Sequence, residues 1–157
     1  TTSYTLSLHD ALPIFAAGQA GERFCVRNSG ADAVVEGCGS NGCEYMTGGT
    51  AVILGEVGHN FAAGMTGGMA FVYDAEGGFE HLVNEETVIY QRVETDYWET
   101  LLRRMVSEHA RETQSRFAER LLIDWQQERN NFWQIVPKEM VNRLSQPVSH
   151  GTRERRA

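Results

Sequence analysis

The nine residues MTGGTAVIL (46–54) return 19 positions later as MTGGMAFVY (65–73), with the first four letters identical and an apolar run after them. Nineteen positions before the first copy lies RNSGADAVV (27–35), again a turn followed by β-branched residues. Nineteen positions after the second copy begins a weaker one at Asn84, in which Val88–Tyr90 take the place of the strand. Residues 18–93 therefore form an internal repeat with a period of about 19 residues.

A repeat this short cannot bury its apolar face alone, so successive copies must stack into a solenoid with a continuous core. We predict a mainly β fold, a parallel β-helix with coils of about 19 residues, followed by a C-terminal α-helical segment. Residues 52–54 should lie beside residues 71–73 in parallel register. Leucine-rich repeats would need a Leu ladder that is absent here, and a flexible linker would lack the Val, Ile and Phe runs.

Glycines recur at the turns of the repeat, where tight coil corners require positive φ or close backbone approach. The corner glycines that we single out are Gly30, Gly48, Gly49, Gly67 and Gly68. A positive φ is the reason that we expect for Gly48 and Gly67. A valine at either position should then be destabilising, because β-branched residues are poorly accommodated at positive φ.

Composition changes near residue 94. Up to that point the chain has 15 of its 16 glycines, 3 basic and 12 acidic residues, a net charge of −9; beyond it, 11 basic and 9 acidic residues give +2. An acidic repeat is unsuited to nucleic acid. No apolar stretch approaches the roughly 20 residues of a membrane span. We expect two architectures in one soluble chain, with neither a nucleic-acid nor a membrane partner.

Three cysteines, Cys25, Cys38 and Cys43, form no small disulfide framework, and no signal peptide is evident. A reducing, cytoplasmic compartment fits this usage. Cys38 and Cys43 could be half of a metal site, but zinc and iron–sulfur sites need about four ligands and no second pair has a suitable spacing. We expect these thiols to fill coil corners, with no metal or cofactor bound.

The second architecture is helical. The first helix is predicted from Asp96 as N-cap, with Glu99 as its capping-box partner. A second helix begins at Ser115 and ends near Asn130, and Pro137 suits the first turn of a third helix through Leu144. The apolar positions at three-and-four spacing are Trp98, Leu101, Leu102, Met105 and Val106 in the first helix, and Phe117, Ala118, Leu121, Leu122 and Trp125 in the second. Residues 146–157 are predicted to be a frayed polar tail.

Aromatic residues accompany these helices: Trp98, Phe117, Trp125, Phe132 and Trp133. Helical spacing favours their packing against the solenoid over ligand binding. The segment TTSYTLSLHDALPI (1–14) lacks the repeat register and resembles a translated assembly scar, so its His9 and Asp10 carry no weight. The predicted organisation is 1–14 non-native, 15–94 β-helix, 95–145 helical and 146–157 tail.

Polar residues of the repeat allow two interpretations. Arg23, Arg27 and Asn28 could brace a carboxylate on a neighbouring domain, because arginine offers a bidentate fork, or they could bond within the coil corners. His59 and Asn60 fall in a turn, where Asn tolerates the left-handed region. The glutamates near corners, taken as solvated without a partner acid, are Glu36, Glu44 and Glu56. No catalytic residue is predicted.

The stretch GERFCVRNSGADAVVEGCGSNGCEYMTGGTAVILGEVGHNFAAGMTGG (21–68) resembles the glycine-motif domain at the C-terminus of the glutamate synthase large subunit. The helical part continues the resemblance at HARETQS (109–115), LLIDW (121–125) and FWQIVPKEM (132–140). The resemblance covers residues 15–157. It implies a right-handed parallel β-helix that has no catalytic residues and packs between the other domains of the subunit.

For the complete subunit, the resemblance implies an enzyme that hydrolyses L-glutamine and adds the ammonia to 2-oxoglutarate at an FMN-bearing barrel. Its electrons come from NADPH, NADH or ferredoxin through iron–sulfur clusters, with a small subunit or ferredoxin as partner. This chain lacks the catalytic cysteine domain, the barrel and the cluster cysteines, so we expect a non-catalytic C-terminal fragment. The alternative is a free β-helix subunit, such as the related one of formylmethanofuran dehydrogenases, or a carbohydrate-binding solenoid.

Overall fold

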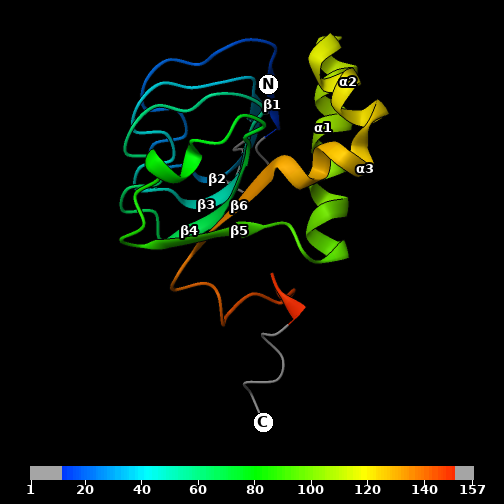
Figure 1. Ribbon diagram of the computed structural model, residues 1–157. Helices are drawn as coiled ribbons and strands as arrows, with labels where there is room; N and C mark the ends of the chain where they lie inside the picture. The colour runs from blue at the N-terminus through cyan, green and yellow to red at the C-terminus, as the bar shows by residue number, and fades with distance from the viewer. Residues whose placement is uncertain (1–11, 151–157) are drawn as a thin grey trace, which may run out of the picture.

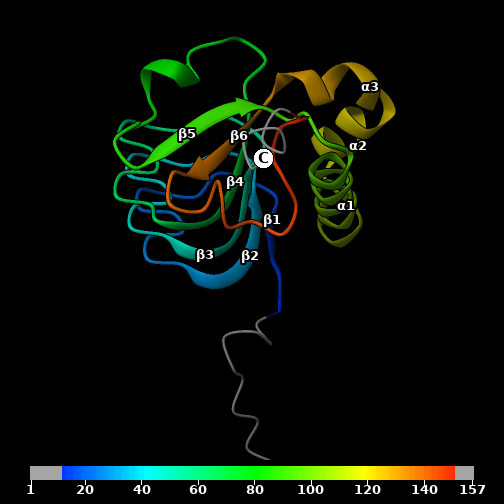
Figure 2. The same ribbon diagram turned by 90° about the horizontal axis from the view of Figure 1, so that it is seen from below.

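The computed structural model describes residues 12–150. The predictions for residues 1–11 and 151–157, including those for His9 and Asp10, lie outside the described part. Within it, a single six-stranded sheet runs through the molecule, with the turns of the coils behind one face and helices over the other (Figures 1 and 2). No helix of residues 12–150 is long and apolar enough to cross a membrane.

Four parallel strands form the stacked coils, about three turns of solenoid. They are β1 (Ile14–Ala16), β2 (Ser29–Val35), β3 (Thr47–Ile53) and β4 (Gly67–Tyr73). Val34 pairs with Val52, and Val52 with Phe71, which confirms the predicted parallel register. Ile14, which the sequence analysis left out of the fold, pairs with Ala33 and therefore belongs to the first strand.

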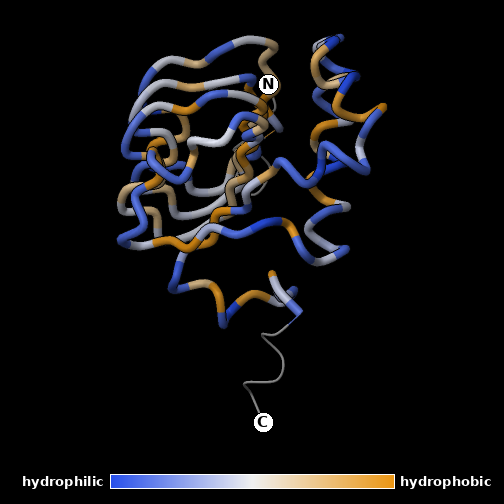
Figure 3. Tube along the Cα trace, viewed as in Figure 1, coloured by the Kyte–Doolittle hydropathy of each residue, from blue (hydrophilic) through white to orange (hydrophobic). Residues whose placement is uncertain are grey.

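Each strand alternates between the two faces of the sheet, as a pleated strand must. Val34, Val52 and Phe71 stack in one row and pack toward the helices. The next residues, from Val35 to Val72, stack in a second row that points into the solenoid. The largest fully buried side chains of that interior are Phe61, Phe79, Met46, Ile53, Met65 and Ile135. One sheet thus separates two hydrophobic cores, and Figure 3 shows hydrophobic residues gathered along its strands.

The solenoid is closed by an antiparallel pair. The strand expected at Val88–Tyr90 is present as β5 (Val88–Arg92), but it does not join β4. Strand β6 (Phe132–Pro137) lies between them and runs antiparallel to both. The sheet order is therefore β1-β2-β3-β4-β6-β5. A segment more than 40 residues downstream of β5 thus completes the sheet.

The third helix predicted from Pro137 is wrong. Pro137 is the last residue of β6, opposite Val88, and turns and bends follow it as far as Ser149, with Met140 N–H donating to Pro137 O at 2.9 Å. The residue before a proline avoids the helical region, which favours the extended run that ends here. A stronger reason for a strand at this position is burial on both faces, because Phe132 and Val136 enter one core and Ile135 enters the other.

Within residues 12–150, three helices and two short 3₁₀ segments accompany the sheet. They are α1 (Asp96–Thr113), α2 (Arg116–Ile123), α3 (Trp125–Glu128), η1 (Phe79–His81) and η2 (Arg129–Asn131). The predicted start of the second helix at Ser115 is confirmed, since Ser115 is the N-cap of α2 and its Oγ accepts the N–H of Ala118 at 3.1 Å. The capping box at Asp96 is wrong. Thr95 is the N-cap of α1, and the side chain of Glu99 instead accepts a hydrogen bond from Trp125 Nε1.

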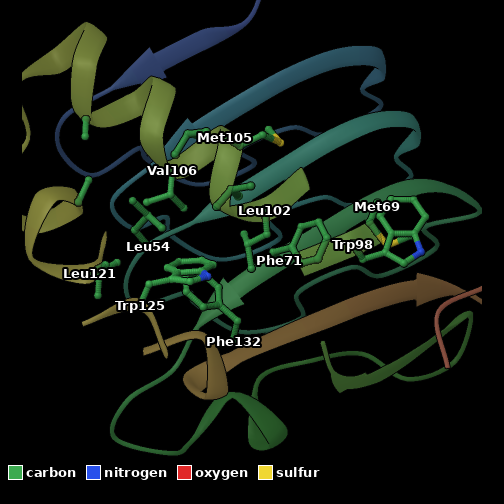
Figure 4. Close-up of a cluster of buried hydrophobic side chains, with 14 of the residues drawn as sticks. Leu54, Met69, Phe71, Trp98, Leu102, Met105, Val106, Leu121, Trp125 and Phe132 are labelled. Atoms are coloured by element: carbon green, nitrogen blue, oxygen red, sulfur yellow. The ribbon is translucent and has the colours of Figure 1, made fainter. Parts of the chain in front are cut away.

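The core between sheet and helices contains the aromatic residues that the sequence suggested would pack. Figure 4 shows Leu102 and Val106 of α1 in one cluster with Phe71 of β4 and with Trp125 and Phe132. Trp98 also joins this cluster, and Phe117 and Leu101 are only partly buried against it. Trp133 points to the opposite face and packs with the solenoid interior. Four of the five aromatic residues, Trp98, Phe117, Trp125 and Phe132, therefore pack between the helices and the sheet.

Residues 146–150 were predicted to fray, and this is wrong. The carbonyl oxygens of Gln146, Pro147 and Val148 accept hydrogen bonds from Trp98 Nε1, Thr95 Oγ1 and Gln91 Nε2 at 3.3, 3.2 and 2.6 Å. The side chain of Val148 is 1% exposed. An apolar residue within a polar stretch can anchor it when neighbouring side chains satisfy its backbone carbonyls. This segment therefore ties the end of β5 and the start of α1 together.

Candidate interdomain surface

The turns behind the sheet share an unusual backbone, in which alternate residues have positive φ. These residues are Arg23, Cys25 and Arg27 in the first coil, Asn41, Cys43 and Tyr45 in the second, and Asn60, Ala62 and Gly64 in the third. Non-glycine residues rarely adopt this region, yet eight of them do so between residues 23 and 62, and seven of these eight have a side chain larger than that of alanine. Backbone hydrogen bonds between coils hold them there, for example from Asn41 N–H to His59 O at 2.9 Å.

Arg23 and Arg27 stand on this surface with φ of 64° and 56°. Their N–H groups donate to Ser40 O and Glu44 O of the next coil, both at 2.9 Å, so the backbone beneath each side chain is fixed. Both side chains are exposed, and neither has an ion pair or side-chain hydrogen bond within residues 12–150. Two unpaired guanidinium groups therefore project from the first coil, each able to grip a carboxylate in a bidentate way.

Asn28 behaves differently from the two arginines with which it was grouped. Its Oδ1 accepts the N–H groups of Gly30 at 3.2 Å and Ala31 at 2.9 Å, and its Nδ2 donates to Ala31 O at 2.8 Å. All of its side-chain polar atoms are thus used within its own turn, the pattern of an Asx turn. This geometry favours the coil-corner interpretation for Asn28.

A ladder of asparagine side chains runs along the same wall. Asn84 Nδ2 donates to Asn60 Oδ1 at 2.9 Å, and Asn60 Nδ2 donates to Asn41 Oδ1 at 3.1 Å. In the first coil the equivalent position is occupied by Arg23, so the row of amides ends at a guanidinium. The sequence analysis missed this ladder, although the spacing of 19 between Asn41 and Asn60 was a signal that could have shown it.

The five glycines divide by mechanism. Gly49 and Gly68 have φ of 82° and 80°, whereas Gly48 and Gly67 are outside the positive region, so the reason expected for the latter pair is wrong. At Gly48 and Gly67 an added Cβ would collide with backbone of the preceding coil, at Ser29 and Thr47 respectively. Close backbone approach, the second reason given for corner glycines, therefore excludes a side chain there. Gly30 lies in β2 and has no positive φ.

Glu36 is not the solvated corner residue that was expected. Ser115 Oγ donates to its Oε1, and His109 Nε2 lies 3.4 Å from the same oxygen. The three residue types resemble a hydrolase set, but the serine bonds the carboxylate and not the histidine, and its oxygen also caps α2. His109 is fully buried, and burial lowers the pKa of its imidazole against the opposing effect of Glu36. The cluster is a clamp between β2 and the α1–α2 junction.

A cleft of about 540 Å³ opens where the coils meet α2. Its walls are residues 54–57 and 72–79 with Phe117, and they include three acidic residues, Glu56, Asp74 and Glu76. Asp74 Oδ2 already accepts hydrogen bonds from Phe79 N–H and Trp133 Nε1, both at 3.2 Å. Tyr73 donates to Glu128, and burial together with that carboxylate raises the pKa of Tyr73 to about 12. The cleft is lined by apolar and acidic residues, and two of its polar groups, those of Tyr73 and Asp74, are already used in hydrogen bonds within the fold.

The donor groups of the described residues do not fit the iron–sulfur clusters that the family resemblance implies for a complete subunit. Cys38 and Cys43 point into the hydrophobic interior, and Cys25 lies partly buried against it. No group of three or more His, Cys, Asp or Glu residues within 12–150 is placed to hold a metal ion.

Comparison with known proteins shows which family this chain is similar to. The sequence pattern of the family described as "GXGXG motif" matches residues 11–138. The chain is 66% identical over 135 residues to the glutamate synthase [NADPH] large chain of Azospirillum brasilense, covering 86% of this chain and 9% of that protein. It is 49% identical over 129 residues to the ferredoxin-dependent glutamate synthase of Pyropia yezoensis, covering 82% and 8%.

A third relative is the glutamate synthase [NADH] of Schizosaccharomyces pombe, 50% identical over 126 residues, with 80% of this chain and 6% of that protein covered. The chain thus spans less than a tenth of the length of each of these three relatives. The match runs through both the stacked coils and the helices that cover them, up to the end of β6. The chain belongs to the GXGXG motif family, and within it resembles one segment of the glutamate synthase large chains.

Proposed function

We propose that this chain is an interdomain scaffold of a glutamate synthase large subunit and supplies no reacting group itself. The observation that carries the proposal is the 66% identity over 135 residues to a segment that makes up only 9% of the Azospirillum large chain. Identity at that level over 135 residues is better evidence than a single motif that this segment belongs to a similar, longer protein. The setting is then a much longer polypeptide whose other domains pack against this one.

In that setting, the complete enzyme would convert L-glutamine and 2-oxoglutarate with a reductant into two molecules of L-glutamate. The relatives are named for NADPH, NADH and ferredoxin, so one of these is the proposed electron source. FMN and an iron–sulfur cluster would be held by the other domains, and the partner would be a small subunit or ferredoxin. We place the enzyme in the cytoplasm, as its cysteine usage favours.

The surface proposed to contact those domains is the first coil. Arg23 and Arg27 project from a backbone pinned to the second coil, and their charges are unpaired within the described residues. Because the backbone beneath each side chain is already fixed, only the side chain itself has to be ordered when a carboxylate binds. Asn28 is excluded from this role, because its side chain bonds within its own turn.

A grafting experiment tests the proposal. In the Azospirillum large chain, the segment that matches residues 11–138 is replaced by the present sequence, and in a control by a flexible linker of equal length. The graft should keep glutamine-dependent glutamate formation, and the linker should abolish it, because catalytic domains must be held in register. The chain alone should neither hydrolyse glutamine nor bind FMN.

Two results would overturn the proposal. Stoichiometric FMN binding or glutaminase turnover by the isolated chain would give it a catalytic part. Full glutamate synthesis by the linker control would show that the segment positions nothing. A chain that failed to support synthesis in the graft while binding a carbohydrate or another subunit on its own would favour the alternative of a free β-helix module.

A further inference from the structure

Two of the three cysteines occupy the same position in neighbouring coils. Cys25 and Cys43 are the middle members of the positive-φ triplets of the first and second coil, with φ of 58° and 57°. The backbone bonds on either side fix their register, because Cys43 N–H donates to Phe24 O at 2.7 Å and Arg27 N–H to Glu44 O at 2.9 Å. Identical local conformation in bonded neighbours makes their side chains point in the same direction.

This placement suits a disulfide bond. Neighbouring strands in a hydrogen-bonded stack lie about 4.8 Å apart. Disulfides join residues whose Cα atoms are about 4.4–6.8 Å apart and whose Cβ atoms face the same side. The two thiols also interact, since a hydrogen bond between them is the largest influence on the pKa of each thiol.

The two thiols differ in reactivity. Cys25 is partly exposed, and the hydrogen bond from Cys43 lowers the pKa of its thiol, so its thiolate is the more accessible nucleophile. Cys43 is fully buried, and its hydrogen bond to Cys25 and burial raise the pKa of its thiol well above the usual value. Cys38, the third thiol of the cluster, has a pKa raised to about 11 by burial. One attacking and one resolving thiol are thus set side by side.

We propose that Cys25 and Cys43 are a peroxide-sensitive pair that closes into a disulfide between the first and second coils. The Cys25 thiolate attacks hydrogen peroxide, an S–O bond forms, the O–O bond breaks and hydroxide leaves to take a proton from water or buffer. The Cys43 sulfur then attacks the resulting sulfenic acid. The S–S bond forms as the S–O bond breaks, and the Cys43 proton leaves with the hydroxyl as water.

Two electrons pass from the thiols to the peroxide, so two thiols and one peroxide give one disulfide and two waters. The bond would secure the coil that carries Arg23 and Arg27. That coil is the end of the described stack, because β1 pairs with β2 alone. The inference is independent of the proposed function, since it concerns only the chemistry of this chain.

Peroxide treatment of the full 157-residue chain tests it. Free thiols are counted with an aromatic disulfide reagent in denaturant before and after exposure, and should fall from three to one per chain. After trypsin, the peptide FCVR (24–27) should be found linked to the peptide 28–92. Cleavage with hydroxylamine between Asn41 and Gly42 then assigns the partner to Cys43 and not to Cys38. A dithiol reductant should restore all three thiols.

Two alanine variants provide matched controls, because each places the residue found at the equivalent position of an adjacent coil. Cys43→Ala copies Ala62 of the third coil, and Cys38→Ala copies Ala20 of the first. Cys38→Ala should lose both of its remaining thiols to peroxide. Cys43→Ala should form no disulfide within the chain, and its Cys25 should instead be oxidised to sulfenic or higher sulfur acids.

The outcomes that would overturn the inference are specific. They are an intact count of three thiols after peroxide, a bond that maps to Cys38, a bond between two chains on a non-reducing gel, or an internal disulfide in Cys43→Ala. The peptide map of the unsubstituted chain decides the question by itself if Cys43→Ala does not fold. A bond at Cys25–Cys43 should also raise the melting temperature, and the reductant should reverse that rise.

Discussion

The stacked coils and the part that closes them rest on the same sheet, yet they are built in different ways. In the coils, each position has an equivalent 18 or 19 residues away, so Val34, Val52 and Phe71 stack in one row. In the closing part, β5 belongs to the weak last copy of the repeat, and the segment from α1 to β6 shows no repeat. Strand β6 reaches its place between β4 and β5 only after α1, α2 and α3 have crossed the outer face of the sheet.

The two regions are stabilised by different kinds of interaction. A coil is held by backbone bonds to its neighbours and by ladders such as Asn41–Asn60–Asn84. The closing part is held by large side chains that meet across long sequence distances, such as Leu102 against the sheet. Stability of a repeat is a sum of local and neighbour terms, whereas a closing element acts through the core as a whole.

The largest effect should come from the closing part. Leu102→Ala is expected to lower the free energy of unfolding by about 3–5 kcal/mol, because its fully buried side chain fills the core between α1 and the sheet. Urea denaturation measures the loss. Ile123→Ala is the matched control, since that side chain is 81% exposed, and should stay within about 0.5 kcal/mol. Equal losses in the two variants would contradict the assignment of the core.

In the coils, glycine substitutions separate crowding from backbone strain. Gly67→Ala should cost about 3 kcal/mol, because its Cβ would meet the backbone of Thr47. Gly77→Ala, with φ of 75° and open space around it, should cost about 1 kcal/mol of strain alone. Gly21→Ala has neither problem and should be neutral within about 0.5 kcal/mol. Thermal and urea melts of the three variants that do not follow this order would refute the close approach between coils.

The asparagine ladder should contribute less. Asn60→Ala removes two side-chain bonds at an exposed position and is expected to cost about 1–2 kcal/mol. His59→Ala, next to it and also exposed, touches neither bond and serves as control. Chemical denaturation compares them. A loss in His59→Ala as large as that in Asn60→Ala would mean that the turn, and not the ladder, holds the coils.

The smallest effect concerns pH at the clamp between the two regions. The pKa of His109 is lower in the fold than in the unfolded chain, where it is about 6.5, because burial disfavours the imidazolium. The unfolded state therefore binds more protons than the folded state when the pH falls below about 6.5. The stability that is present above that pH is lost as the pH falls toward and through the pKa of His109 in the fold. Unfolding free energies measured from pH 7.5 to 5 should show this slope.

His109→Gln should flatten that slope even if it lowers stability overall, because the titrating group is removed. His59→Gln, at an exposed site, should leave the slope unchanged. A slope that is the same in His109→Gln and in the unsubstituted chain would show that other groups cause the loss of stability in acid.

The sequence predicted the coils and not their closure, for a physical reason. In a stacked repeat, equivalent residues of successive copies lie beside each other. The pairing of residues 52 and 53 with 71 and 72 could therefore be derived from the period alone. The FWQIVP run could have been a strand or the end of a helix, and only the open edge of β4 decided between them. The same limit applies to Glu36, whose partners His109 and Ser115 lie more than 70 residues away.

For the candidate surface, the sequence located Arg23 and Arg27 but not their backbone. Residues other than glycine at positive φ are held there by bonds between coils, which no local propensity predicts. The glycine pairs were found correctly as a pattern. The positive φ was expected at the first glycine of each pair, whereas in these bulged strands the second glycine has it, and both glycines of each pair lie against neighbouring backbone.

The most direct test of the scaffold is the amount of ammonia released for each glutamate formed by the grafted Azospirillum enzyme. The variant combines Arg23→Ala with Arg27→Ala, and its control combines Arg103→Ala with Arg104→Ala, which removes equal charge from the exposed face of α1. We predict that the ratio rises severalfold in the first and stays unchanged in the second, with glutamine hydrolysis retained in both. An unchanged ratio in the first variant, or the loss of one half-reaction with no ammonia released, would contradict the scaffold.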